Sequence, residues 1–263
     1  MGKIIDISHH QGDIDWSKAS KDVDLAIIRT QYGTNTIDRK YVRNISECKK
    51  YKIPFGVYIY VTFTNKTQAL AQAKDFYERA KGHNPLFYVV DVEEAFGASV
   101  QSIVQGTQAF IDYLKGKGVK VGLYTGHHFY KPYQMNTVKN YDFLWIPRYS
   151  LTSAQGLKPE YPCDLWQFTE SGEVAGIKGN VDLNVLNGSK PLSWFTNIVE
   201  QNEKDDDKMQ FTNETTKAAV RDYLKQAVDK KLIDKSHLEK FDAGTLTGGD
   251  FEGLKIIIAQ RSN

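Results

Sequence analysis

Residues 85–94 read PLFYVVDVEE, an apolar run that ends in three carboxylates. The apolar part is typical of a strand that is buried on both faces, as in a parallel sheet covered by helices. Because side chains alternate along a strand, Asp91 and Glu93 are expected to share one face with Phe87 and Val89. A buried charge without a partner is costly. Two acids on this face therefore indicate a functional site, unless the strand end is solvated or caps a helix.

Strands and helices alternate on both sides of this stretch. The expected strands cover residues 3–8, 25–30, 55–62, 86–93, 120–124, 143–146, 164–168 and 180–183, and the main expected helices cover residues 39–50, 67–81, 100–117 and 128–137. Five strand–helix units followed by three strands with loops predict an α/β fold, an irregular TIM-like (β/α)5β3 barrel. A doubly wound open sheet is the alternative, and the lack of G-x-G-x-x-G after the first strand disfavours it.

Composition narrows the classes of partner. The net charge of +2 gives no sign of a nucleic-acid-binding surface, and no apolar run approaches the roughly 18 residues of a membrane span. Cys48 and Cys163 form no C-x-x-C motif and are expected to be free thiols. The histidine pairs at 9–10 and 127–128 lack metal-ligand spacing. We therefore expect no metal, no cofactor, and neither nucleic acid nor membrane as a partner. The N-terminus enters a strand at once, so no signal peptide is expected.

Acids stand at the ends of three expected strands: Asp6, then Asp91 with Glu93, then Asp182. In barrels of this type the functional side chains project from the C-terminal ends of the strands, and the first and last strands are neighbours. The four carboxylates are therefore predicted to face one cleft. Crowded like charges push pKa values apart and leave one acid protonated near neutrality. A general acid for a glycosidic oxygen needs this property. A divalent cation site is the alternative.

Aromatic and polar side chains also stand near the expected strand ends. The aromatic candidates for packing on sugar rings are Tyr60, Tyr124, Trp166 and Trp145, with a core position as the alternative for each. The polar candidates for binding substrate or holding carboxylates are Arg29, Gln31, Arg148 and Gln167. Together they predict an aromatic rim around an acidic cleft.

Five motifs in chain order resemble glycoside hydrolase family 25, the Chalaropsis-type lysozymes. They are DISHHQG with IDW (residues 6–12 and 14–16), DVE (91–93), GLYT (122–125), WQF (166–168) and GNVDLN (179–184). The resemblance covers residues 3–190 and implies an irregular five-helix (β/α) barrel. It also implies hydrolysis of the β-1,4 bond between N-acetylmuramic acid and N-acetylglucosamine in peptidoglycan.

The resemblance implies roles for individual residues. Glu93 matches the proton donor and Asp91 its partner, while Asp6 and Asp182 match the other two acids of the cleft. Tyr60 and Tyr124 match aromatic residues beside the sugar in the cleavage subsite. Pro147 departs from the family pattern, in which a small residue is common at this position of the rim.

The group that attacks the anomeric carbon is left open at this point. Asp91 or Asp182 can serve as nucleophile or base. Alternatively, the N-acetyl oxygen of the sugar attacks while a carboxylate steadies the amide nitrogen. We favour this substrate-assisted route because every peptidoglycan substrate carries a 2-acetamido group within reach.

The composition changes after Leu192. Residues 200–208 read EQNEKDDDK, which is typical of a solvated linker. Helical spacing then predicts helices over 212–230, from 236 onward and over 251–260, with Thr212 as the cap of the first helix. The predicted organisation is a catalytic barrel (1–192), a charged linker (193–211) and a small helical domain (212–263). Such a small core is marginal, and wall binding, self-association or docking on the barrel are its expected uses.

The chain is thus similar to a phage endolysin. We expect bacterial peptidoglycan as its partner, and location in the host cytoplasm until release to the cell wall. One competing interpretation is a carbohydrate-binding barrel without hydrolysis, which needs the aromatic rim but not four acids. Another is a metal-dependent lyase or aldolase, which would bring a lysine or several histidines to the strand ends.

Overall fold

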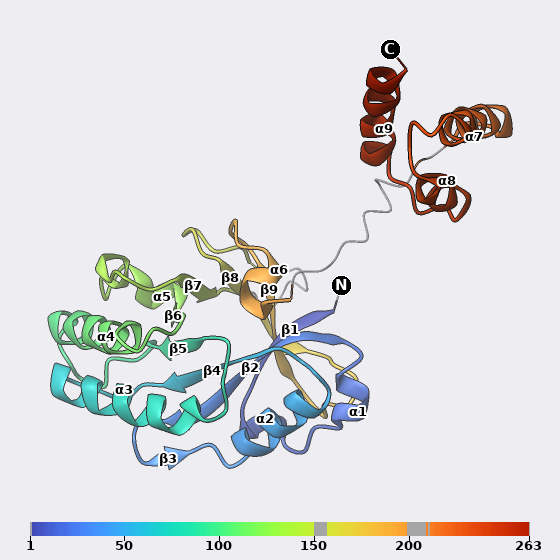
Figure 1. Ribbon diagram of the computed structural model, residues 1–263. Helices are drawn as coiled ribbons and strands as arrows, with labels where there is room; N and C mark the ends of the chain where they lie inside the picture. The colour runs from blue at the N-terminus through green and yellow to red at the C-terminus, as the bar shows by residue number, and fades with distance from the viewer. Residues whose placement is uncertain (1, 150–156, 199–208, 210, 263) are drawn as a thin grey trace. The chain divides into compact units, whose positions relative to one another are not determined.

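The computed structural model describes residues 2–149, 157–198, 209 and 211–262 (Figure 1). It divides into two compact units, Met1–Ile198 and Val199–Asn263. The charged run at 200–208 lies outside the described residues. The first unit continues to Ile198, beyond the domain end predicted at residue 192.

Eight strands of the first unit close into a barrel. They are β1 (Lys3–Ile7), β2 (Val23–Tyr32), β4 (Phe55–Tyr60), β5 (Tyr88–Asp91), β6 (Val121–Tyr124), β7 (Phe143–Pro147), β8 (Leu165–Gly172) and β9 (Val181–Leu186). Each strand pairs with the next, and β1 pairs with both β2 and β9, so the sheet closes on itself. The short strand β3 (Thr36–Ile37) pairs with the end of β2. The predicted barrel is confirmed, and the open sheet is excluded.

The last strand runs opposite to the expected direction. β9 is antiparallel to both β8 and β1, whereas β1, β2 and β4–β8 pair in parallel. Asp182 therefore lies near the start of β9, not at the C-terminal end of a parallel strand. The reversal still brings Asp182 to the rim where the parallel strands end, because its register partner is Asp6 near the end of β1.

Helices cover the outside of the barrel (Figure 1). The helices of the first unit are α1 (Trp16–Ala19), α2 (Tyr41–Lys50), α3 (Lys66–Lys81), α4 (Val100–Lys115), α5 (His127–Tyr130) and α6 (Leu192–Thr196), with the 3-10 turns η1 (His9–Gln11) and η2 (Met135–Thr137). Asn65 and Ser99 begin α3 and α4, because their side chains accept hydrogen bonds from backbone amides of the first turn. The helix expected over 128–137 is divided into α5 and η2, where Gln134 has a φ of 54°.

Strand β5 separates two apolar layers, as the alternation predicted. Phe87 and Val89 point into the barrel, whereas Tyr88 and Val90 face the helices. The Tyr88 ring lies 5.4 Å from that of Phe76 on α3. Asp91 continues the inward face of β5 and marks the boundary between the apolar interior and the polar rim.

Glycines make room for large rings inside the barrel. A Cβ at Gly56 would overlap the Phe87 ring, and a Cβ at Gly122 would overlap the Phe143 ring. Large and small residues thus alternate between adjacent strands, which lets the interior fill without voids. Phe195 of α6 packs on both rings, with centroid distances of 5.9 Å to Phe87 and 5.1 Å to Phe143. Since these residues precede the rim on their strands, α6 closes the opposite end of the barrel.

The second unit is a three-helix domain with α7 (Glu214–Asp229), α8 (Lys235–Asp242) and α9 (Gly248–Arg261). Its core is formed by Leu224, Ala227, Ile233, Phe241, Leu246, Leu254 and Ile258. The predicted cap Thr212 is wrong: the Asn213 side chain accepts from the Thr216 amide. Helix α9 begins at Gly248, before the expected residue 251, because Thr247 caps it. Across the described residues, we find no helix with the length and apolar character to span a bilayer.

Candidate active site

A cleft of about 810 Å³ opens at the rim of the barrel. All four predicted acids, Asp6, Asp91, Glu93 and Asp182, line it. Asp6 and Asp182 are direct register partners on β1 and β9. The structure therefore brings together carboxylates that stand far apart in the sequence.

Asp6 is fixed by a buried hydrogen-bond network. Its carboxylate accepts from Gln167 Nε2 at 3.0 and 3.2 Å and from Asn184 Nδ2 at 2.8 Å. The amide oxygens are satisfied in turn: Gln167 Oε1 accepts from the Tyr124 hydroxyl at 3.1 Å, and Asn184 Oδ1 accepts from Trp145 Nε1 at 2.7 Å. Burial raises the pKa of Asp6, but the two amide donors favour its charged form.

Asp182 keeps a proton beside Asp6. Burial, followed by the charge of Asp6 and a hydrogen bond to it, raises the pKa of Asp182 to about 9. At neutral pH Asp182 is therefore the neutral partner, and its hydroxyl donates to the Asp6 carboxylate. Two acids thus carry one negative charge between them.

Asp91 and Glu93 form a second pair. Asp91 is only 4% exposed, and its Oδ1 has no hydrogen-bond partner in the described part of the chain. Burial and then the charges of Glu93 and Asp6 raise the pKa of Asp91, while Arg29 opposes the rise. Burial, followed by the charges of Asp6 and Glu94, raises the pKa of Glu93 to about 7. A carboxyl with this pKa exchanges its proton near neutrality.

The family follows from comparison with known proteins. Residues 5–177 match the profile of "Glycosyl hydrolases family 25". The chain belongs to this family. The autolytic lysozyme of Clostridium acetobutylicum is 30% identical over 186 residues, which are 69% of this chain and 55% of that protein. Lysozyme M1 of Streptomyces globisporus is 27% identical over 200 residues, which are 70% of this chain and 67% of that protein.

A solved structure supports the same assignment. The catalytic domain of the endolysin ply40 from bacteriophage P40 of Listeria monocytogenes superposes with a TM-score of 0.69 at 32% identity. The match covers 75% of this chain and 98% of that domain. The barrel of this chain is therefore a family 25 glycoside hydrolase domain. The chain spans only about half the length of the Clostridium relative.

Tyr60 and Tyr124 line the family 25 cleft on either side of Asp91. Both are register partners of Asp91, on β4 and β6. Tyr60 stacks on Tyr32 at 4.7 Å, and its hydroxyl donates to Glu94 at 3.2 Å. Tyr124 is 8% exposed and contacts the cleft-lining Trp145 at 4.6 Å. Burial raises the pKa of both phenols, so both hydroxyls stay protonated.

Trp166 lies on the outward face of β8, away from the cleft. Its ring packs against the helix layer, and Nε1 donates to the Arg148 carbonyl at 2.7 Å. The alternation of the strand explains this placement, since the next residue, Gln167, faces inward. The Arg148 side chain is ion-paired to Glu160 at 2.6 Å and lines an adjoining hollow of about 300 Å³ together with Glu93.

The two polar candidates on β2, Arg29 and Gln31, have side chains that point to different places. A register shift between Arg29 and Gln31 breaks the alternation. Arg29 faces the cleft, whereas the Gln31 amide donates to Asp75 of α3 at 2.7 Å. Gln31 is therefore part of the packing between β2 and α3.

Several cleft residues were not predicted from the sequence: Ser8, His10, Gln11, Tyr58, Tyr149, Glu170, Lys178, Gly179, Asn180 and Asn184, the last in the network behind Asp6. Asn184 had a signal, because it stands two residues after Asp182 and shares its face of β9. Within the described ranges, no set of three or more His, Cys, Asp or Glu side chains is arranged to hold a metal ion.

Proposed function

We propose that the protein is a peptidoglycan hydrolase that cleaves the β-1,4 bond between N-acetylmuramic acid and N-acetylglucosamine, with Glu93 as the general acid. The observation that carries the proposal is the pKa of about 7 for Glu93 in a cleft shared with three other carboxyls. A general acid is most effective when its pKa lies near the working pH. Family membership supports hydrolysis of a glycan, and the acids supply the chemistry.

The proton inventory favours Glu93 over its neighbours as the donor. Asp182 uses its proton in the hydrogen bond to Asp6, so this proton is not available for the leaving group. Glu93 and Asp91 repel each other's charge and together retain a proton near neutrality. Because Glu93 is the more exposed of the two, it is the group placed to deliver this proton to a bound glycosidic oxygen.

The route of attack we propose is substrate-assisted. As Glu93 protonates the leaving oxygen, the acetamido oxygen of the sugar attacks the anomeric carbon and the glycosidic bond breaks. Water then opens the cyclic intermediate and gives its proton to the Glu93 carboxylate. Asp91 is proposed to steady the amide nitrogen, because its buried Oδ1 has no partner among the described residues and can accept from that N–H when Glu93 holds the proton of the pair. The proton of Asp182 makes that residue the weaker candidate.

The two cleft tyrosines would position the reacting sugar. Tyr60 and Tyr124 flank Asp91 from the adjacent strands, and their rings offer apolar surfaces on which sugar faces pack. Their hydroxyls stay neutral, so they can also donate hydrogen bonds to sugar oxygens. Arg148 at the adjoining hollow is proposed as a rim contact.

The direct test is Glu93→Gln in the full-length protein. It should lower the release of reducing ends from purified peptidoglycan by ~10²-fold or more while the thermal melting curve is retained. Glu94→Gln is the matched control, because it neutralises the adjacent exposed carboxyl. The control should keep most activity at neutral pH. As the pH rises, the control should lose activity at a lower pH than the wild type does, because removing the charge of Glu94 lowers the pKa of Glu93. Near-normal activity of Glu93→Gln would remove Glu93 from the acid role.

Product analysis separates the proposal from its competitors. Borohydride reduction of the new ends should label muramic acid, whereas labelled glucosamine would assign the other glycosidic bond. Binding to walls without release of reducing ends would indicate a non-hydrolytic barrel. A rate that collapses with a chelator would indicate a metal-dependent reaction.

The three-helix unit is proposed to bind the bacterial cell wall, where the hydrolase would act. It has its own apolar core and follows the barrel in the chain. Self-association through this unit is the competing proposal. Sedimentation with walls and analytical ultracentrifugation of the free protein distinguish the two.

A further inference from the structure

A second hollow of about 420 Å³ adjoins the cleft. Arg29, His10 and Tyr60 line both cavities, so a ligand can extend from one into the other. The outer part of the hollow is formed around the β2–β3 turn by Tyr32, Ile37 and other residues. Its volume lies in the range of about 300–1,000 Å³ that is common for small-ligand sites.

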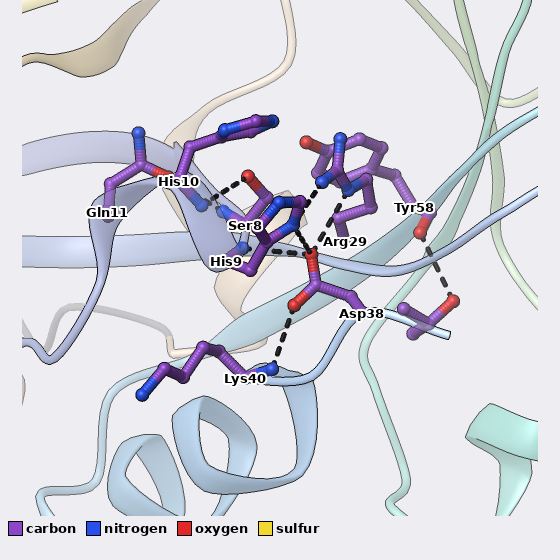
Figure 2. Close-up of polar contacts among 9 residues, drawn as sticks. Ser8, His9, His10, Gln11, Arg29, Asp38, Lys40 and Tyr58 are labelled. Atoms are coloured by element: carbon purple, nitrogen blue, oxygen red, sulfur yellow. Dashed lines mark hydrogen bonds and ion pairs between the residues drawn. The ribbon is translucent and has the colours of Figure 1, made fainter. Parts of the chain in front are cut away.

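The one acid among the described residues that line this hollow, Asp38, is paired with Arg29 (Figure 2). Its side chain is 1% exposed, and Oδ2 accepts from Arg29 Nε at 3.2 Å and from the His9 backbone amide at 2.9 Å. Oδ1 accepts from the Lys40 amide at 2.9 Å. Burial tends to raise the pKa of Asp38, but these donors outweigh it and lower the pKa. Asp38 is therefore an ionised carboxylate whose charge is balanced by Arg29.

Arg29 contacts His9 as well as Asp38. Its Nη2 donates to His9 Nδ1 at 2.7 Å, as Figure 2 shows. The same nitrogen lies 3.1 Å from Asp38 Oδ2, so the His9 ring contacts both the guanidinium and the carboxylate. Burial, followed by the charge of neighbouring groups, lowers the pKa of His10, so His10 is uncharged near neutrality.

Arg39 is left as an uncompensated cation at this hollow. It is exposed, and among the described residues it has neither an ion pair nor a hydrogen bond. Next to it stand two unusually exposed apolar side chains, Ile37 at 50% and Tyr32 at 38%. A free guanidinium beside apolar surface suits a ligand that has both a carboxylate and small aliphatic groups.

We propose that this hollow binds the peptide stem of peptidoglycan, with Arg39 pairing to a stem carboxylate and Tyr32 and Ile37 contacting its aliphatic side chains. The inference rests on the proposed function, since the stem is attached to the glycan that would occupy the cleft. The apolar walls favour a peptide over a phosphate polymer of the wall, which offers charge without aliphatic side chains.

The experiment compares two substrates of the full-length protein: peptidoglycan with intact stems, and the same glycan after an amidase has removed them. The wild type is expected to have the higher kcat/KM on the intact polymer. Arg39→Gln should lower the ratio of the two values about fivefold, which is what an exposed ion pair contributes at its upper end. An unchanged ratio in this variant would overturn the proposal.

Lys49→Gln is the matched control. It removes the same charge from an exposed position of α2 that is not part of the hollow. General attraction of a basic protein to an anionic wall would be weakened equally in both variants. The proposal requires that Lys49→Gln keeps the wild-type ratio, and an equal drop in both variants would contradict it.

A binding measurement separates this inference from the proposed hydrolysis. Calorimetric titration uses a synthetic stem tetrapeptide with free carboxylates, the same peptide with amidated carboxylates, and a glycerol phosphate polymer. The free-acid peptide should bind to the wild type and bind more weakly to Arg39→Gln, even if the protein proves inactive on glycan. Equal binding of the amidated peptide, no binding of either peptide, or binding of the phosphate polymer alone would refute the stem site.

Discussion

Asp6 and Asp91 show how neighbours decide the state of a residue. Both carboxyls are buried, yet Asp6 accepts hydrogen bonds from two side-chain amides, whereas Asp91 Oδ1 has no partner among the described residues. The amides favour charge on Asp6, and Asp182 then keeps its proton as a hydrogen-bond donor. Residues of one type are thus set to different protonation states by the atoms around them.

The Asp6–Asp182 pair predicts a pH-dependent stability. The folded protein raises the pKa of Asp182 from its ordinary value of 3.8 to about 9, so between these pH values it holds a proton that the unfolded chain has lost. The free energy of unfolding must therefore fall as the pH rises through this window. Asp182→Asn keeps an N–H donor toward Asp6 but cannot titrate, so its stability should fall less between pH 5 and 9.

Urea unfolding of the wild type and Asp182→Asn at several pH values measures this difference. The variant should gain stability relative to the wild type as the pH rises, and should lose hydrolytic activity if Asp182 belongs to the catalytic cleft. Parallel stability curves for the two proteins would contradict the shared proton.

Strands β4–β7 combine large and small residues inside the barrel. Gly56 and Gly122 alternate with Phe87 and Phe143, so the interior of the barrel depends on where side chains are missing as well as on where they are large. The register that aligns these residues also places Tyr60, Asp91 and Tyr124 side by side at the rim. Packing at one end of the strands therefore maintains the site at the other.

Gly122→Ala should destabilise the barrel by about 1–3 kcal/mol, because its Cβ would overlap the buried Phe143 ring. The control is Gly82→Ala, since Gly82 has a φ of −69° and nothing within 4 Å of its Cβ position. Urea unfolding measures both. Adding Phe143→Leu should restore part of the stability lost in Gly122→Ala, and no rescue would place the strain elsewhere.

The whole molecule consists of two units with separate cores. Phe195 belongs to the first, where it contacts Phe87 and Phe143, although it follows the domain end predicted at residue 192. The composition change that suggested this boundary reflects the onset of polar sequence, not the end of the barrel's packing. A truncated chain must therefore include Phe195 to keep the packing of the barrel.

A chain shortened to residues 1–198 should fold and cleave soluble glycan fragments at close to the full-length rate, but sediment less with purified walls. A chain ending at residue 192 should lose about 3–5 kcal/mol of stability, because it lacks the buried Phe195 ring. Thermal unfolding and wall sedimentation test both proteins. Undiminished sedimentation of the 1–198 chain would instead favour self-association as the role of the three-helix unit.

The sequence by itself determined the barrel and the identity of its four acids. Alternation along a strand and the order of strand–helix units are local properties, and β5 with Asp91 shows both of them. Their positions near expected strand ends also indicated Tyr60 and Tyr124, which the structure places on the strands beside Asp91.

Only the tertiary structure decided which neighbours surround these residues. The reversed direction of β9 sets Asp182 against Asp6, and the register shift in β2 turns Gln31 away from the cleft while Arg29 stays in it. Trp166 points outward because the phase of β8 is fixed by its pairing with β7 and β9. Strand direction, register and proton sharing depend on contacts between segments distant in the chain, so no local pattern of residues specifies them.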